Sequence, residues 1–160
     1  MGTPELSRED LKLTELSYVK INALILLMIL PLSMIGYQFA VSNEEMFFVY
    51  EWSLVALLLI SFILAGATSV IYNSSNKWLS YAILSFDLQF AVFGLFMGRY
   101  TSYELFFVYY LCSAIALIVF FMTFKKVKVF RYLIIIFIIV TVLLTSYMVL
   151  LQSLWGTNWV

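Results

Sequence analysis

The most apolar stretch of the chain is residues 132–152, YLIIIFIIVTVLLTSYMVLLQ. A helix needs about 20 mostly apolar residues to cross the hydrocarbon core of a bilayer. Strands of a membrane barrel alternate apolar and polar residues over about 10 positions, and this stretch does not alternate. It therefore predicts a membrane-spanning helix. The helix is apolar all round, so we expect it to have no distinct interior face and to touch lipid over most of its circumference. The hydroxyls of Thr141, Thr145 and Ser146 can be satisfied within the same helix.

Four further stretches meet the same requirement, so the chain predicts five spans. In chain order the five spans are residues 19–40, 48–72, 78–98, 103–124 and 132–152. The connections between them are short, and short connections make consecutive helices antiparallel. Composition agrees with a membrane protein: 64% of the 160 residues are hydrophobic and 11% are charged, whereas a soluble domain carries about 25% charged residues. The predicted fold class is all-α, an integral membrane five-helix up-and-down bundle.

Two short segments flank the five-helix domain, which covers residues 19–152. Residues 1–18 contain a candidate helix over positions 4–16, with Thr3 as a possible N-cap and proline at the first helical position. This helix either lies in the membrane interface or docks another subunit, and both interpretations stay open. Residues 153–160 carry two tryptophans, which favour the headgroup level, so this tail is predicted to lie at the outer interface.

Two spans contain residues that bend or pack helices. Pro31 lies inside the first span, where a proline removes a backbone hydrogen bond and predicts a kink. The second span contains residues 65–69, AGATS. Small residues let helices approach closely in lipid, so this cluster is expected to pack against the third span, its neighbour along the chain.

Basic residues predict the orientation, because cytoplasmic ends of spans are enriched in lysine and arginine. With the N-terminus inside, the inner side holds Arg8, Lys12, Lys20, Lys77, Lys125, Lys126, Lys128 and Arg131. The outer side holds only Arg99, so the prediction is N-terminus inside and C-terminus outside. The last four inner residues form one basic connection. That connection is either a topology signal or a contact for anionic lipid headgroups.

Asp87 is the one acidic residue near the middle of a predicted span. An ionised carboxylate at the centre of a bilayer costs at least about 2.5 kcal/mol. Asp87 is therefore expected either to handle protons or cations, or to be protonated and hydrogen-bonded to a neighbouring helix. Neither interpretation is excluded by the sequence.

A face of small residues runs along the same span. Asp87, Ala91, Gly94 and Gly98 follow one another at helical spacing, and residues 94–98 form a GxxxG pair. Small residues of this kind allow close approach of two helix backbones. We expect this face to make the tightest helix contact in the protein, either within the chain or with another subunit.

The residues that carry most enzyme chemistry are missing. The sequence has no histidine and one cysteine, Cys112, and it contains no phosphate-binding loop, nucleophile elbow or metal-spaced cluster. We therefore predict no catalytic residue, no metal ligand and no directly bound cofactor, so the chain is not expected to be an enzyme by itself. Net charge is zero, which gives no field for capturing nucleic acid. The expected partners are membrane lipids, held structurally, and other integral membrane subunits.

The order of the five spans, together with two short segments, resembles a known family. Residues 103–110, YELFFVYY, and residues 32–34, LSM, are similar to helices of the five-helix form of subunit III of haem-copper respiratory oxidases. The resemblance implies a cofactor-free subunit beside a catalytic core. That family keeps histidines and a buried glutamate in its helices, and these have no counterpart here, so no site residue is transferred. The tyrosine- and isoleucine-rich composition also resembles that of archaeal membrane proteins, which predicts a prokaryotic plasma membrane.

Three functions remain as hypotheses. The first is an accessory subunit of a larger membrane complex, specifically a respiratory terminal oxidase or related electron-transport assembly. The second is a small transporter or channel that uses Asp87 to handle ions or protons. The third is an assembly factor, which differs from the first in not being stoichiometric in the mature complex.

Overall fold

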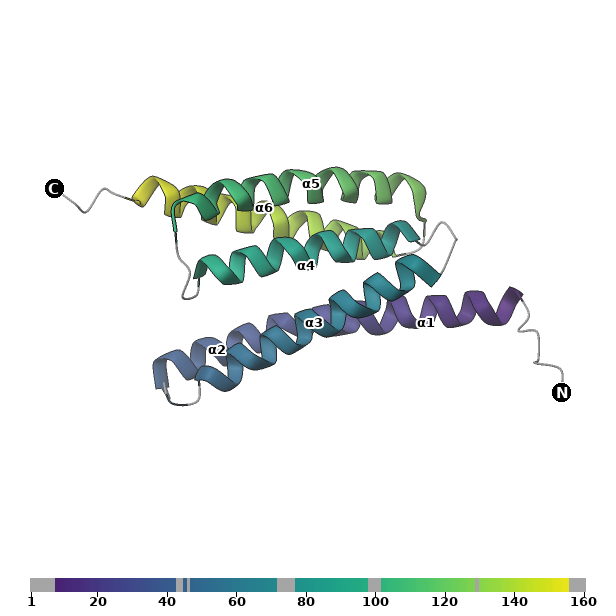
Figure 1. The fold of residues 1–160 in the computed structure, drawn as a ribbon, viewed down its shortest axis with the longest axis horizontal. Helices are drawn as coiled ribbons and strands as arrows, with labels where there is room; N and C mark the ends of the chain where they lie inside the picture. The colour runs from purple at the N-terminus through teal and green to yellow at the C-terminus, as the bar shows by residue number, and fades with distance from the viewer. Residues whose placement is uncertain are drawn as a thin grey trace. The chain divides into compact units, whose positions relative to one another are not determined.

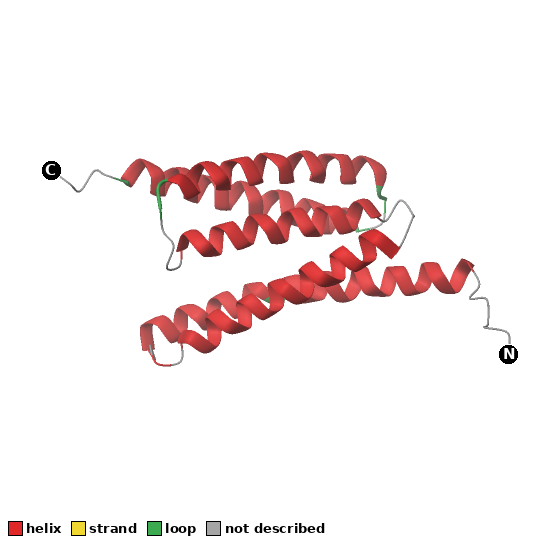
Figure 2. Ribbon diagram, viewed as in Figure 1, coloured by secondary structure: helices red, strands yellow, loops and turns green. Residues whose placement is uncertain are grey.

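The computed structural model describes residues 8–42, 45, 47–71, 77–97, 102–128 and 130–155. Its helices are α1 (Arg8–Leu27), α2 (Ile29–Ser42), α3 (Phe47–Ile71), α4 (Lys77–Met97), α5 (Glu104–Lys126) and α6 (Arg131–Leu154). The described residues form α-helices, with a 3₁₀ turn at Glu45, and contain no strand (Figure 2). Helices α3, α4, α5 and α6 are each long and apolar enough to cross a membrane. The predicted all-α membrane fold is confirmed.

The chain divides into two compact units, Met1–Ser80 and Tyr81–Val160. In the first unit α1 and α2 follow one another and α3 returns beside them (Figure 1). In the second unit α4, α5 and α6 run side by side (Figure 1). The four later predicted spans agree with α3 to α6 to within two residues at each end, because the apolar run that sets the length of a spanning helix can be counted directly.

The first predicted span differs from the observed structure. Helix α1 runs through the predicted junction near residue 18 without a break, so the lead segment and the start of the span form one helix. The interruption falls instead at Met28, and α2 continues from there. The prediction of a separate helix over residues 4–16 is therefore wrong: from residue 8 onward, this segment is the beginning of α1. Thr3, its proposed N-cap, lies outside the described residues.

Pro31 explains where the interruption falls. Proline has no N–H, and its ring clashes with the carbonyl four residues earlier, which here belongs to Leu27, the last residue of α1. The Met28 N–H bonds to the carbonyls of both Leu24 and Ile25, each at 3.1 Å. This shared bond tightens the helix end before α2 resumes. The kink predicted from Pro31 is thus a break between two helices.

Two contacts hold α1 and α2 against α3. The Asn22 side chain in α1 donates from Nδ2 to the Ser61 carbonyl of α3 at 3.1 Å. Farther along, a Cβ added at Gly36 in α2 would collide with the ring of Tyr50 in α3. A larger residue here would require the Tyr50 ring to move, so α2 and α3 make a close contact that sequence reasoning did not identify.

The small-residue cluster of α3 packs as expected. Ala65 is fully buried. One turn later, the Thr68 hydroxyl lies 2.8 Å from the hydroxyl of Ser80 in α4. Both hydroxyls belong to the first unit. The predicted packing of residues 65–69 against the following helix is confirmed at these positions. Gly66, by contrast, has no neighbouring atom within 4 Å of an added Cβ.

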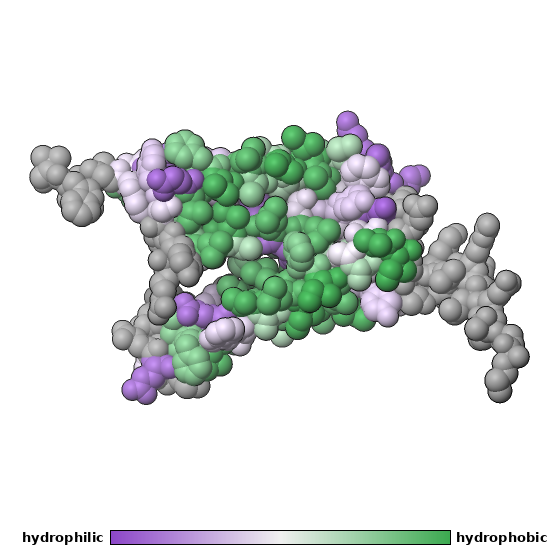
Figure 3. Space-filling model, viewed as in Figure 1, coloured by the Kyte–Doolittle hydropathy of each residue, from purple (hydrophilic) through white to green (hydrophobic). Residues whose placement is uncertain are grey.

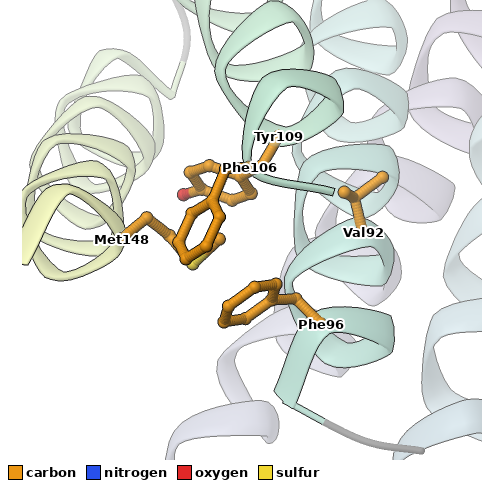
Figure 4. Packing of buried hydrophobic residues seen from close by; sticks show 5 residues of the cluster. All are labelled: Val92, Phe96, Phe106, Tyr109 and Met148. Carbon is orange, nitrogen blue, oxygen red and sulfur yellow. The ribbon is translucent and has the colours of Figure 1, made fainter. Parts of the chain in front are cut away.

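A compact apolar core joins the three helices of the second unit. Its five buried members are Val92 and Phe96 of α4, Phe106 and Tyr109 of α5, and Met148 of α6 (Figure 4). The rings of Phe96 and Phe106 lie 4.5 Å apart between their centroids. Such aromatic pairs contribute about 0.5–1.5 kcal/mol beyond the area they bury, so they help to fix the packing of α4 against α5.

Helix α6 does have an interior face, and the expectation of none was wrong. Ile134, Phe137, Thr141 and Met148 are buried at roughly helical spacing, whereas Tyr132 is 83% exposed. The hydropathy of the helix is uniform, so it could not mark this face. The interior face is defined by side-chain packing instead, since the Phe137 ring stacks on that of Phe86 in α4 with centroids 4.5 Å apart. Most of the α6 surface remains exposed, as expected.

The exposed surface of both units is unusually apolar. Large hydrophobic side chains such as Leu24, Ile63, Leu111 and Leu143 are exposed along the helices. On the face drawn in Figure 3, apolar side chains cover the helix centres and hydrophilic ones gather near the helix ends. Lipid solvates such a surface at no cost, whereas water does not.

Candidate functional site

A buried polar centre lies at the middle of the second unit. Gln89 of α4 is 1% exposed. Its Nε2 donates to the hydroxyl of Tyr109 on α5 at 2.8 Å. Its Oε1 accepts from the hydroxyl of Thr141 on α6, also at 2.8 Å. One amide thus connects all three helices of the unit, and we call Gln89, Tyr109 and Thr141 the polar centre.

Aromatic rings enclose the polar centre. Gln89 lies on the α4 face that also carries Phe86 and Phe93, one helical turn away on either side. The Phe86 ring stacks on Phe137 next to the amide, and the Phe93 ring lies 6.2 Å from that of Tyr109. In such a low-dielectric environment a hydrogen bond is strong, and an unsatisfied polar group is costly. Each partner of Gln89 is therefore important to the fold.

The polar centre is built for cross-linking helices. An amide and two hydroxyls are uncharged at neutral pH. Gln89 uses its donor end on one helix and its acceptor end on another. Both ends are engaged with protein groups, so the arrangement fixes the register of α5 and α6 on α4.

A second glutamine, Gln152 near the end of α6, binds two tyrosines at the beginning of α5. The hydroxyl of Tyr110 donates to Gln152 Oε1 at 2.7 Å. Gln152 Nε2 then donates to the Tyr103 hydroxyl at 3.3 Å. The nearby Trp155 ring packs edge-on against Phe106 at 5.6 Å. This group combines apolar rings with polar tips, which is typical of the membrane–water interface.

Asp87 is buried, at 2% exposure, but it lies apart from the polar centre. Two residues along a helix correspond to about 200° of rotation, so Asp87 and Gln89 lie on opposite faces of α4. Ala91 and Gly94 share the Asp87 face and are half-buried. The structure therefore places these three predicted residues together on one face. Gly98 lies outside the described residues.

The role of this face stays a prediction. A Cβ added at Gly94 would meet no atom within 4 Å. The closest glycine contact among the described residues is instead that of Gly36 with Tyr50. The predicted tight contact at this face, either within the chain or with another subunit, therefore stays untested.

The four basic residues of the last connection lie at one end of the second unit. Lys125 and Lys126 end α5, Lys128 follows, and Arg131 begins α6; all four are exposed. The Arg131 guanidinium lies over the Phe124 ring, 5.2 Å from its centroid. The structure thus brings these predicted residues together, while their role remains to be tested.

Sequence reasoning missed the polar centre. Thr141 was expected to bond within its own helix, yet it bonds to Gln89 across helices. Thr145 likewise donates to Ser113 of α5, at 3.4 Å, and only Ser146 bonds within α6 as expected. The available signal was Gln89 itself, because an amide in the middle of a span must find partners in protein.

Within the described ranges, no three residues among histidine, cysteine, aspartate and glutamate come together as metal ligands would. The site is therefore characterised by its hydrogen bonds and aromatic contacts. Comparison with known proteins adds no further constraint, since no protein-family model, curated protein or solved structure matches the chain.

Proposed function

We propose that this protein is a non-catalytic structural subunit of a larger integral membrane complex. One observation carries the proposal: the buried Gln89 amide, in the middle of a spanning helix, has both ends engaged in bonds between helices. That is the chemistry of a rigid scaffold. A substrate site would instead direct polar groups at a cavity.

The half-buried Gly94 face supports the presence of a partner. Asp87, Ala91 and Gly94 share one face of α4, and a Cβ added at Gly94 would meet no atom within 4 Å. A helix from another subunit would fit closely against small residues there.

The proposed setting is a respiratory terminal oxidase or a related electron-transport assembly in a prokaryotic plasma membrane. Two resemblances support it: that of the sequence to five-helix subunit III proteins, and that of its tyrosine- and isoleucine-rich composition to archaeal membrane proteins. In this role the chain would brace a core subunit and hold lipids against it, without binding a cofactor.

Purification from native membranes in a mild detergent tests the proposal. We expect the chain to co-purify in stoichiometric amount with subunits that absorb visible light, as measured by native mass spectrometry and absorbance spectra. Recovery from those membranes as a lone, stable monomer would contradict it. Transient or substoichiometric association would instead identify an assembly factor.

A small transporter or channel is the second candidate, favoured by the buried Asp87 within a spanning helix. Proteoliposomes separate the two functions. A scaffold predicts no ion or proton flux above that of empty vesicles. Flux that is lost in Asp87→Asn but kept in Glu51→Gln, which alters an exposed acid on α3, would replace the scaffold proposal with transport.

A further inference from the structure

We propose that the turn between α5 and α6 binds the headgroup of an anionic phospholipid. The described residues of the turn are 127, 128 and 130; Lys125 and Lys126 lie just before it, Lys128 lies within it and Arg131 lies just after it. The site goes beyond the scaffold role, because a structural subunit needs no selective lipid. The argument rests on how the turn is built.

The turn is anchored to the helices by Val127. This residue is 3% exposed, and its N–H donates to the Thr123 carbonyl at 2.8 Å. Its backbone is extended, with φ −112° and ψ 122°. In extended backbone, neighbouring side chains point to opposite sides. Burying Val127 therefore directs Lys128 outward, where it is exposed, and Lys126 at the end of α5 is exposed as well.

Arg131 is held in place from two directions. Its guanidinium lies over Phe124 in the last turn of α5, a contact that contributes about 0.5–1 kcal/mol at an exposed position. Its backbone follows Phe130, which adopts a left-handed conformation with φ 63° and ψ 28°. A bulky residue pays strain to adopt that conformation. The result is a sharp reversal that brings Arg131 back beside α5.

The electrostatics favour an anion at this place. The Phe130 carbonyl accepts from the N–H groups of Leu133 and Ile134. The N–H groups of Arg131 and Tyr132 come before these two, and the helix itself supplies no carbonyl acceptor for them. They form the positive end of the 24-residue helix α6. No aspartate or glutamate follows Glu104 in the sequence, so α6 and the rest of α5 supply no counter-ion.

The surroundings favour a lipid over a free phosphate ion. The adjoining turns of α5 and α6 expose large apolar side chains: Met122, Phe121, Tyr132, Ile135 and Ile136. A phospholipid presents acyl chains to such surfaces while its phosphate reaches the basic residues at the helix ends. Anionic lipids are attracted to basic groups next to spans, and inorganic phosphate would match only the charged part.

Native mass spectrometry of the full chain in detergent tests this site. The probes are phosphatidylglycerol and phosphatidylcholine of identical acyl chains. We expect phosphatidylglycerol to bind the wild type selectively. The triple variant Lys125→Gln, Lys128→Gln, Arg131→Gln should bind it at least about tenfold more weakly, since each basic residue near a membrane surface favours anionic lipid. Phosphatidylcholine binding should not change.

Two controls and one replacement variant make the result decisive. Lys125→Arg, Lys128→Arg and Arg131→Lys together keep the charge and should keep most of the selectivity. Inorganic phosphate at millimolar concentration should not displace the lipid; if it does so fully, the site recognises phosphate alone and the lipid proposal fails. Should the triple variant not fold by circular dichroism, the exposed single variant Lys128→Gln replaces it, with a several-fold loss expected. Equal binding of both lipids by the wild type, or unchanged binding in the variants, would show that these charges serve only as a topology signal.

Discussion

Replacing Gln89 with methionine should destabilise the second unit by cutting both links of the polar centre. Methionine keeps the length and approximate volume of glutamine but has no amide. The variant loses the bond to Tyr109 and the bond from Thr141, each 2.8 Å long. The surrounding aromatic packing is retained, so the measured change reports on the hydrogen bonds.

The expected magnitude follows from the number of bonds. Hydrogen bonds between membrane helices contribute about 0.6 kcal/mol on average and at most about 1.7 kcal/mol. Two such bonds predict a loss of about 1–3 kcal/mol in the free energy of unfolding. Tyr109→Phe removes only one of them and should cost about half as much. Thr141 limits the loss, because its hydroxyl can turn to a carbonyl of its own helix.

These free energies can be measured by reversible unfolding in bicelles, with steric trapping as the method that detects the unfolded state. A double-mutant cycle of Gln89→Met with Tyr109→Phe should give a coupling energy of about 0.6–1.7 kcal/mol. Ser146→Ala is the matched control, because that exposed hydroxyl bonds only within α6 and its loss should be nearly neutral. A coupling energy below about 0.3 kcal/mol, the scatter expected of independent sites, would refute a cross-linking role for Gln89.

Two further substitutions test the packing in each unit. Gly36→Ala should destabilise by about 1–3 kcal/mol, because the new methyl group meets the Tyr50 ring. Gly66→Ala is the control: it has open space around it and should be neutral or stabilise by up to about 1 kcal/mol. Similar losses of stability in Gly36→Ala and Gly66→Ala would argue against the close contact between Gly36 and Tyr50. Phe137→Ala removes the ring stacked on Phe86 and should cost about 2 kcal/mol or more by the same unfolding assay. This loss of stability is smaller than that for the same substitution in the core of a soluble protein, because the ring stays in lipid when the helices separate. No measurable loss of stability would contradict the stacking.

The positions of four spans could be predicted because bilayer thickness fixes helix length. The apolar runs that became α3 to α6 are bounded by charged or polar residues, and counting them gave the helix ends. The first span was harder. Pro31 indicated that the helix would be interrupted, yet the sequence did not determine whether it would kink one helix or separate two. The answer depended on whether Met28 could close the end of α1, which is a matter of local hydrogen bonding.

The candidate site was predicted only in part. Asp87, Ala91 and Gly94 do share a face of α4, because helical spacing alone determines that. Gln89 was missed, although it lies two residues from Asp87. Its importance depends on Tyr109 and Thr141, which are distant in sequence and become its partners only when α5 and α6 pack against α4.

The sequence by itself determined that this is an all-helical membrane protein and where α3, α4, α5 and α6 begin and end. It did so because hydrophobic burial in lipid depends on composition and length, both of which are local properties. Only the tertiary structure decided which face of each helix is interior. In a chain this uniformly apolar, hydropathy does not distinguish protein from lipid. The fit of Gly36 to Tyr50 and the bonds of the Gln89 amide make that distinction, and both arise only when the helices meet.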